Sequence, residues 1–583
     1  MCPSLNLHAI VLKEPVIRLN DSLAPGAIGE HVTTSPLGST APLGGGGARG
    51  PARQRALVDI IALAVLGATL AFVLVTVVSS PLKDDIAWLL WVARKWLGGR
   101  ELYVDLVEVN PPFVVWLYAI PAGVAMWLDL APRMVSSPFF ALILLGNAWW
   151  TASLLQGRAP IAGRRIPVFS VIGTLLLLLP GVEFGQREHL LAAAVLPYIA
   201  LFVRAIGGER EPRTHGAFAG AVAALGCAMK PSYALALVLL EVIGVLRGQR
   251  RLRAAPVAFV VTTGLYGLTV LAIEPDFLTR AVPLALALYG GTDTPLWDIL
   301  LESRSLLLGQ AVALMLCWRS EAILGRHSTF LRDLFLALVA FGAACTVLFV
   351  MQGKDWFYHS LPAMTVTVLA LVLWLVVALK AQAGTLTATG LPALPWRRLY
   401  APLSLTLVAL LVFSVADVQR LRSWVAAATT PTLSTEIRLV KLIEREKAHT
   451  YVAFSEWIGL GFPVVNDSGV SWASRFDSMW ALKGEIWKAR QDGRAPADWP
   501  IRRWVARDFV AGCPDIAVVD TRQGINYVAV LAASDEDFAQ AWSQYHEIAA
   551  FEGLVVFKRD SFGCEDEPLP LGRSPQAAMA PGD

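Results

Sequence analysis

Two adjacent aspartates, Asp84 and Asp85, directly follow the first long apolar stretch of the sequence. Acidic side chains at a membrane surface are costly, so they usually serve a function. In a group-transfer reaction, such a carboxylate can take the proton from an attacking hydroxyl group. We therefore choose this pair as the candidate catalytic residues. The alternative is that both aspartates only cap the helix that follows them.

Further polar residues stand at the ends of other apolar stretches, and they combine carboxylates with cations and aromatic rings. The candidate binding residues are Tyr103, Asp105, Glu108, Asn110, Arg187, Glu188, His189, Lys230, Lys354, Tyr358 and His359. Glu183 and Gln186 stand just before Arg187 and belong to the same cluster. Cations could hold a departing phosphate while a carboxylate activates a hydroxyl. The simpler explanations are a solvated turn, snorkelling of the lysine and an aromatic belt at the membrane interface.

The composition indicates a polytopic membrane protein. Of the 583 residues, 55% are hydrophobic and only 16% are charged, against roughly 25% charged in soluble domains. A bilayer-spanning helix needs about 20 apolar residues. On that basis we predict eleven spans, at residues 56–79, 138–156, 166–180, 189–203, 216–229, 231–246, 256–273, 305–317, 334–350, 361–379 and 400–415.

A twelfth apolar run, at residues 113–130, decides the topology. If it does not cross the membrane, the arginine-containing loops and the tail arginines all fall on one side, which the positive-inside rule makes cytoplasmic. These segments are 49–55, 158–165, 204–213, 247–253, 319–332 and 380–398. We therefore expect residues 113–130 to form a second juxtamembrane helix, after an amphipathic interfacial helix at residues 85–97. All candidate residues then lie at the outer face.

Three regions follow from this pattern: a disordered cytoplasmic tail at 1–55, a membrane domain at 56–418 and a small extracytoplasmic α/β domain at 419–583. In the last region we predict strands at 451–454, 463–465, 516–519 and 554–557, and helices at 436–447 and 535–548. Cys513 and Cys564 could form a disulfide there, because oxidising compartments permit one; the sequence leaves this open. The net charge of +3 indicates no nucleic-acid partner.

The first outer loop resembles that of the GT-C membrane glycosyltransferases, in the branch similar to bacterial protein O-mannosyltransferases and the lipid A aminoarabinose transferase. The matching residues are Asp84-Asp85, Gly98-Gly99, Leu102-Tyr103, Asp105 and Asn110-Pro111-Pro112. By position the resemblance implies Asp84 as the base. The family's second acid is often Glu where this chain has Asp85, so the choice between the two stays open. Asn110 replaces the lysine of the aminoarabinose branch, which argues against that donor.

The resemblance also implies a bacterial inner-membrane enzyme that moves a hexose or pentose from a polyprenyl-phosphate donor to an envelope glycan, lipid or protein. Arg187, Lys230 and Lys354 would bind the phosphate. No cofactor is required, although Asp84, Asp85, Asp105 and Glu108 together could hold a divalent metal. The main alternative is a transporter or flippase of a lipid-linked saccharide, and a second is a membrane-anchored sensor or assembly protein.

Overall fold

The computed structural model describes residues 49–158, 164–326, 328–382, 396–430, 434–493 and 499–560. The chain divides into two units, Met1–Arg55 and Ala56–Asp583. Most of the expected cytoplasmic tail lies outside the described residues, and so does Cys564. The fold below is that of the second unit.

Each of the eleven predicted spans coincides with a helix. These helices are α1 (Arg49–Ser79), α4 (Pro132–Leu155), α5 (Arg165–Leu178), α6 (Arg187–Ile206), α7 (Arg213–Met229), α8 (Ala234–Leu246), α9 (Ala254–Ile273), α12 (Arg304–Ser320), α13 (Thr329–Met351), α14 (Leu361–Gln382) and α15 (Trp396–Thr429). Within the described ranges, eight helices are long and apolar enough to cross a membrane, namely all of these except α5, α7 and α8. The chain is therefore a multi-pass membrane protein.

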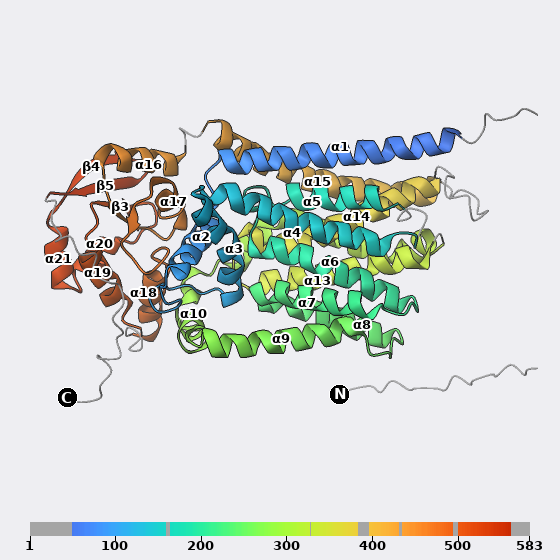
Figure 1. The fold of residues 1–583 in the computed structure, drawn as a ribbon, viewed down its shortest axis with the longest axis horizontal. Helices are drawn as coiled ribbons and strands as arrows, with labels where there is room; N and C mark the ends of the chain where they lie inside the picture. Colours follow the sequence, from blue (N-terminus) through green and yellow to red (C-terminus); the bar gives the residue numbers. More distant parts are fainter. Residues whose placement is uncertain are drawn as a thin grey trace, which may run out of the picture. The chain divides into compact units, whose positions relative to one another are not determined.

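Helix α6 is the central helix of the membrane region. It is buried without a break from Arg187 to Val203, and it packs against α4, α7, α13 and α14 (Figure 1). Helix α9 is the opposite case, because most of its side chains are exposed in the structure and would face lipid. The start of α6, which carries Arg187 and Glu188, is thus held among several other helices.

The first outer loop forms two helices, α2 (Asp84–Leu97) and α3 (Pro112–Leu128), which pack against each other. We expected the first to be an amphipathic helix in the membrane interface; in the structure every residue from Ile86 to Ala93 is buried, so its apolar face is covered by protein. The cover comes from the C-terminal region. The Phe462 ring lies 4.9 Å from the Trp88 ring, and Asn466 donates to the Ala87 carbonyl at 3.1 Å. Helix α3 is shorter than a full span, and its juxtamembrane placement stays a prediction.

The remaining elements connect the long helices. Helices α10 (Val282–Leu288) and α11 (Leu296–Glu302) lie between α9 and α12, with the short turn η4 (Tyr289–Thr292) between them. Two other single turns precede α6 and α14, η1 (Gly181–Glu183) and η6 (Phe357–Ser360). These loops matter because several candidate residues sit in or beside them.

The C-terminal region is a small α/β domain. Five strands form one sheet in the order β2-β1-β3-β5-β4, with β1 parallel to β2 and β3 and with an antiparallel β4–β5 hairpin. The strands are β1 (Thr450–Phe454), β2 (Ser471–Trp472), β3 (Ile516–Asp520), β4 (Tyr545–Phe551) and β5 (Leu554–Arg559). The helices are α16 (Thr435–Glu446), α17 (Val464–Ser468), α18 (Trp480–Asp492), α19 (Ile501–Gly512), α20 (Tyr527–Ala532) and α21 (Glu536–Trp542). Figure 1 labels most of them.

Three details of this region differ from the sequence prediction. Helix α15 continues to Thr429, past the predicted domain boundary at residue 418. Residues 463–465 form no strand: Val464 and Val465 begin the helix α17, which ends at Ser468 and is followed by Gly469 in the left-handed conformation. The predicted helix at 535–548 stops at Trp542, and strand β4 follows it. Cys513 is disulfide-bonded, whereas Cys227, Cys317 and Cys345 in the long helices are free.

Candidate functional site

Asp84 is held firmly at the start of α2. Its Oδ1 atom accepts the Asp85 backbone N–H at 2.8 Å and lies 3.0 Å from the Lys83 ammonium. Its Oδ2 atom accepts the indole N–H of Trp457, from the C-terminal domain, at 3.3 Å. Burial raises the pKa of Asp84, and the neighbouring Lys83 opposes that shift. Both oxygens are therefore engaged by the protein.

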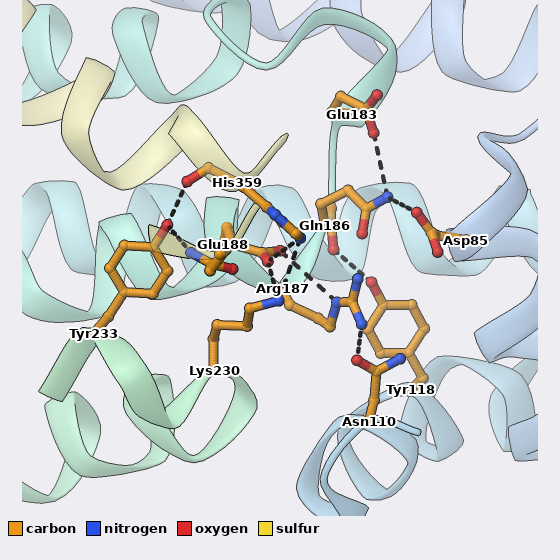
Figure 2. Close-up of polar contacts among 12 residues, drawn as sticks. Asp85, Asn110, Tyr118, Glu183, Gln186, Arg187, Glu188, Lys230, Tyr233 and His359 are labelled. Carbon is orange, nitrogen blue, oxygen red and sulfur yellow. Dashed lines mark hydrogen bonds and ion pairs between the residues drawn. The ribbon is translucent and has the colours of Figure 1, made fainter. Parts of the chain in front are cut away.

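Asp85 is less engaged than its neighbour. Among the described residues, its carboxylate accepts a single hydrogen bond, from the Gln186 side-chain amide at 3.1 Å. The same amide donates to Glu183 at 3.2 Å, so Gln186 links the two acids (Figure 2). Asp85 is half-buried. Of the two candidate bases, it is the one with oxygen lone pairs left for a substrate.

The turn that carries Gln186 has a tightly defined shape. Gly185 adopts φ +96°, and a Cβ atom there would lie 2.5 Å from the Phe140 ring, so only glycine fits. Its carbonyl accepts the Tyr118 hydroxyl at 2.6 Å. The shape of this turn therefore fixes where Gln186 and the start of α6 point.

A chain of hydrogen bonds connects the first outer loop to Arg187. Trp88 donates to Glu108 at 2.6 Å, and Glu108 accepts the Asn110 backbone and side-chain N–H groups at 2.7 and 2.6 Å. The Asn110 side-chain oxygen in turn accepts a hydrogen bond from Arg187. The Arg187 guanidinium also lies over the Tyr358 ring, 5.5 Å from its centre. This arrangement holds a cation at the start of α6.

Glu188 is fully buried among cationic and imidazole groups. Its carboxylate lies 3.4 Å from the Lys230 ammonium, 3.5 Å from the His359 ring and 3.7 Å from the Arg187 guanidinium. The Lys230 ammonium also lies 3.2 Å from the His359 Nε2 atom. With His359 neutral, two positive charges face one negative charge. This buried cationic group, Arg187, Glu188, Lys230 and His359, is drawn together in Figure 2.

Several polar atoms of this group lack a hydrogen-bond partner in the described part of the chain. They are the Arg187 Nε atom, both Glu188 carboxylate oxygens and the His359 Nδ1 atom. Buried polar atoms without a partner are rare in folded proteins. The Arg187 Nε–H is a donor that water or an anionic ligand could use, whereas the Glu188 oxygens are acceptors that lie in ion pairs with Lys230 and Arg187.

Other predicted site residues serve the protein itself. The Lys354 ammonium donates to Asp293, Thr292 and the Tyr289 carbonyl, at 2.6, 2.6 and 3.0 Å. The His189 ring uses both nitrogens on backbone groups of Gly185 and Leu176. Asp105 accepts the Glu101 backbone N–H at 3.1 Å, and Tyr103 donates to the Asn110 carbonyl at 2.7 Å. The hydrogen bonds of the first three go to residues outside the buried cationic group, and Tyr103 supports Asn110.

The carboxylates of the first outer loop do not gather into one cluster. Asp105 serves a local turn, and Glu108 is tied to Trp88 and Asn110. Within the ranges that the structure covers, no group of three or more His, Cys, Asp or Glu side chains could hold a metal ion. A metal held jointly by Asp84, Asp85, Asp105 and Glu108 therefore has no support from this geometry.

Comparison with known proteins gives one similar solved structure to report. Neither a protein-family model nor a curated protein matches the chain. The structure is similar to that of ArnT from Cupriavidus metallidurans bound to undecaprenyl phosphate, with a TM-score of 0.45 and 14% identity, over 87% of this chain and 98% of that one. At this identity and TM-score the likeness says nothing of the site residues.

Two residues of the C-terminal domain that the sequence did not mark as candidates lie at the site. Trp457 reaches Asp84, as described above. Burial, together with the nearby carboxylates of Glu108 and Asp85, raises the pKa of Asp477 well above its usual range. Nothing in the sequence around Trp457 signals its role. Asp477 stands two residues after Arg475, which the sequence suggests is structural and which pairs with Asp508 at 2.7 Å.

Glu183 should make the stability of the protein depend on pH. Burial, with Asp84 and Asp85 nearby, raises the pKa of Glu183 from 4.5 to about 8, against the effect of Lys83. Between pH 4.5 and about 8, Glu183 binds fewer protons in the unfolded chain than in the folded one. The stability of the wild type therefore falls as pH rises through this interval. Glu183→Gln stays neutral, so its thermal unfolding midpoint in detergent should fall less over that interval. Equal slopes for the two proteins would contradict this assignment.

Proposed function

We propose that this chain is a membrane glycosyltransferase that moves a sugar from a polyprenyl-phosphate donor to a hydroxyl group of an envelope glycan, lipid or protein. The observation that carries the proposal is that Asp85 lies near the buried cationic group of Arg187, Glu188, Lys230 and His359. In this function the group would face the phosphate of the donor, and we therefore name it the phosphate-facing group. Gln186 donates to Asp85, and Arg187 and Glu188 are the next two residues of the chain. A proton acceptor and an anion-binding group thus stand side by side. The motif of the first outer loop agrees with this function.

In the reaction, Asp85 accepts the proton of the acceptor hydroxyl. The hydroxyl oxygen forms a bond to the anomeric carbon of the sugar, while the bond between that carbon and the phosphate oxygen breaks. The lipid phosphate leaves with the electron pair. Arg187 and Lys230 stabilise the negative charge that develops on it, which is a large contribution in a site with little water. His359, beside Lys230, completes the phosphate side.

Glu188 explains how two cations remain buried before a donor binds. An unpaired buried charge is strongly unfavourable, so a partner is needed in the empty site. Glu188 supplies one negative charge for two positive ones, through ion pairs with Lys230 and Arg187. The site therefore keeps a net positive charge for a phosphate. Glu108, Asn110 and Tyr103 fix Arg187 from the other side.

We propose that the site faces the periplasm of a bacterial inner membrane, with the N-terminus cytoplasmic and the C-terminal domain outside. The arginine-rich loops support this orientation through the positive-inside rule. The disulfide of Cys513 supports it independently, because disulfides persist in oxidising compartments. Among the described residues, the free cysteines Cys227, Cys317 and Cys345 lie in the apolar helices α7, α12 and α13.

The function is tested with the purified protein in lipid vesicles. The vesicles receive a panel of polyprenyl-phosphate hexoses and pentoses, and membranes from a strain that lacks the protein supply the acceptor. We expect release of polyprenyl phosphate together with a glycosylated product, at the same rate in EDTA, since no metal is proposed. Movement of an intact donor across the vesicle without cleavage would favour a flippase instead. Loss of turnover in EDTA, restored by a divalent cation, would contradict the metal-free mechanism.

A further inference from the structure

The C-terminal domain contacts the start of α2 in two distinct ways. Asn466 donates to the backbone carbonyl of Ala87 at 3.1 Å, a contact that attaches the domain to the helix. Trp457 instead donates its indole N–H to the Asp84 carboxylate at 3.3 Å. The second contact touches one of the two candidate catalytic residues. It therefore needs an explanation beyond domain attachment.

The Trp457 side chain is fixed on several sides. The Arg522 guanidinium lies over the indole ring, 5.4 Å from its centre. Gly459 approaches the ring so closely that a Cβ atom there would lie 2.4 Å from it. The Trp457 backbone N–H donates to the Ser455 hydroxyl at 2.9 Å. The indole N–H therefore has little freedom to turn away from Asp84.

Asp520 anchors this arrangement at the sheet. It is the last residue of β3 and is buried, and it accepts two side-chain hydrogen bonds from Arg522, both at 2.8 Å. It also accepts the Ser455 hydroxyl at 2.8 Å. Ser455 directly follows β1, which runs parallel to β3, so the two residues meet at the carboxyl edge of the sheet. That edge is where parallel sheets commonly place functional residues.

We propose that Trp457 is a positioning residue for the transfer reaction: the C-terminal domain uses it to hold Asp84, and Asp84 in turn fixes the start of α2 and the direction of Asp85. The connection runs from Asp520 through Ser455 and Arg522 to Trp457, and from there to Asp84 and the Asp85 N–H. The inference rests on the proposed function. It makes the C-terminal domain a part of the catalytic unit.

The hydrogen bond has a consequence for the pH dependence of the reaction. An N–H donor stabilises the charged form of a carboxyl group, so its removal raises the pKa of that group. Asp84 already has a raised pKa because of burial, with Lys83 opposing and Asp85 adding to the shift. Charged Asp84 accepts the Asp85 backbone N–H and so positions the base, which makes the acid limb of the kcat profile depend on Asp84 as well as on Asp85. Trp457→Phe should therefore move that limb to higher pH. A loss of about 1.4 kcal/mol corresponds to one pH unit.

The experiment compares Trp457→Phe with Asn466→Ala, which removes a contact of the same domain to the same helix without touching an acid. We measure kcat as a function of pH, and binding of polyprenyl phosphate, for both variants and the wild type. Trp457→Phe should lower kcat at neutral pH roughly tenfold and shift its acid limb upward by about one unit, as the loss of a hydrogen bond to a charged group implies. Its lipid binding should match the wild type. Asn466→Ala should keep the wild-type profile.

Other results would overturn the inference. If the acid limb of kcat does not shift in Trp457→Phe, or if it shifts equally in Trp457→Phe and Asn466→Ala, then Trp457 only attaches the C-terminal domain to α2. If Trp457→Phe does not fold, Arg522→Gln takes its place, because Arg522 is exposed and its loss frees the indole; it should shift the profile in the same direction. If the wild-type protein has no transferase activity, the result contradicts the proposed function, and the inference about Trp457 fails with it.

Discussion

Asp85→Asn should reduce turnover of the sugar donor by about 10²–10⁴-fold, the usual contribution of general base catalysis. The substitution keeps the shape of the side chain, and the Gln186 amide can still donate to its oxygen. What is lost is the ability to accept the acceptor's proton. Binding of polyprenyl phosphate should therefore stay within about twofold of the wild type, because only the chemical step is affected.

Two other substitutions serve as controls for this result. Asp105→Asn changes a carboxylate of the same loop that only accepts a backbone N–H, and it should keep nearly full activity. Asp84→Asn should fall between the two, because Asp84 holds the start of α2 without facing the substrate. An active Asp85→Asn protein beside an inactive Asp84→Asn protein would reverse the two roles and contradict the assignment of the base.

Lys230→Gln should weaken binding of polyprenyl phosphate by at least about 30-fold, because truncating one partner of a buried charge pair costs 2 kcal/mol or more. The substitution removes one of the two cations that face Glu188. It leaves the phosphate-facing group without the surplus positive charge that an anion needs. Titration of the purified protein with polyprenyl phosphate, followed by tryptophan fluorescence, measures the effect.

Lys354→Gln is the matched control, since the sequence alone favours both lysines equally. The Lys354 ammonium is already bonded to Asp293, Thr292 and a carbonyl. Its loss should lower the thermal unfolding midpoint and change lipid affinity less than about twofold, as expected for a residue outside the binding group. Equal losses of affinity in the two variants would contradict the assignment. A double variant, Lys230→Gln with Glu188→Gln, tests whether the unpaired Glu188 carboxylate contributes to any loss of stability.

The sequence predicted the parts of the fold that depend on local pattern. Each predicted span coincides with a helix because a long apolar run leaves few alternatives. The acidic pair falls at the start of α2 for a similar local reason, since carboxylates favour a helix N-terminus. The short apolar run at 463–465 was ambiguous, because a run of that length fits a strand or a buried helix equally well.

The residues whose roles differ from the prediction are those with distant partners. The sequence marks Lys354 as a cation near a membrane surface, and only the folded loop brings Asp293 to it. His189 lies in the first turn of α6, which begins two residues before the predicted span, and its ring bonds a carbonyl of α5. The tryptophans of α2 suggest an interface, and the cover comes from Phe462 and Asn466 far along the chain. Pattern within a segment cannot show which other segment will cover it.

The hydrogen bond between Trp457 and Asp84 joins residues 373 positions apart. Asp84 is made early in translation, whereas its indole partner is made only after every long helix has been synthesised. The hydrogen bond that holds Asp84 can therefore form only near the end of synthesis, when the whole membrane region is already in place along the chain.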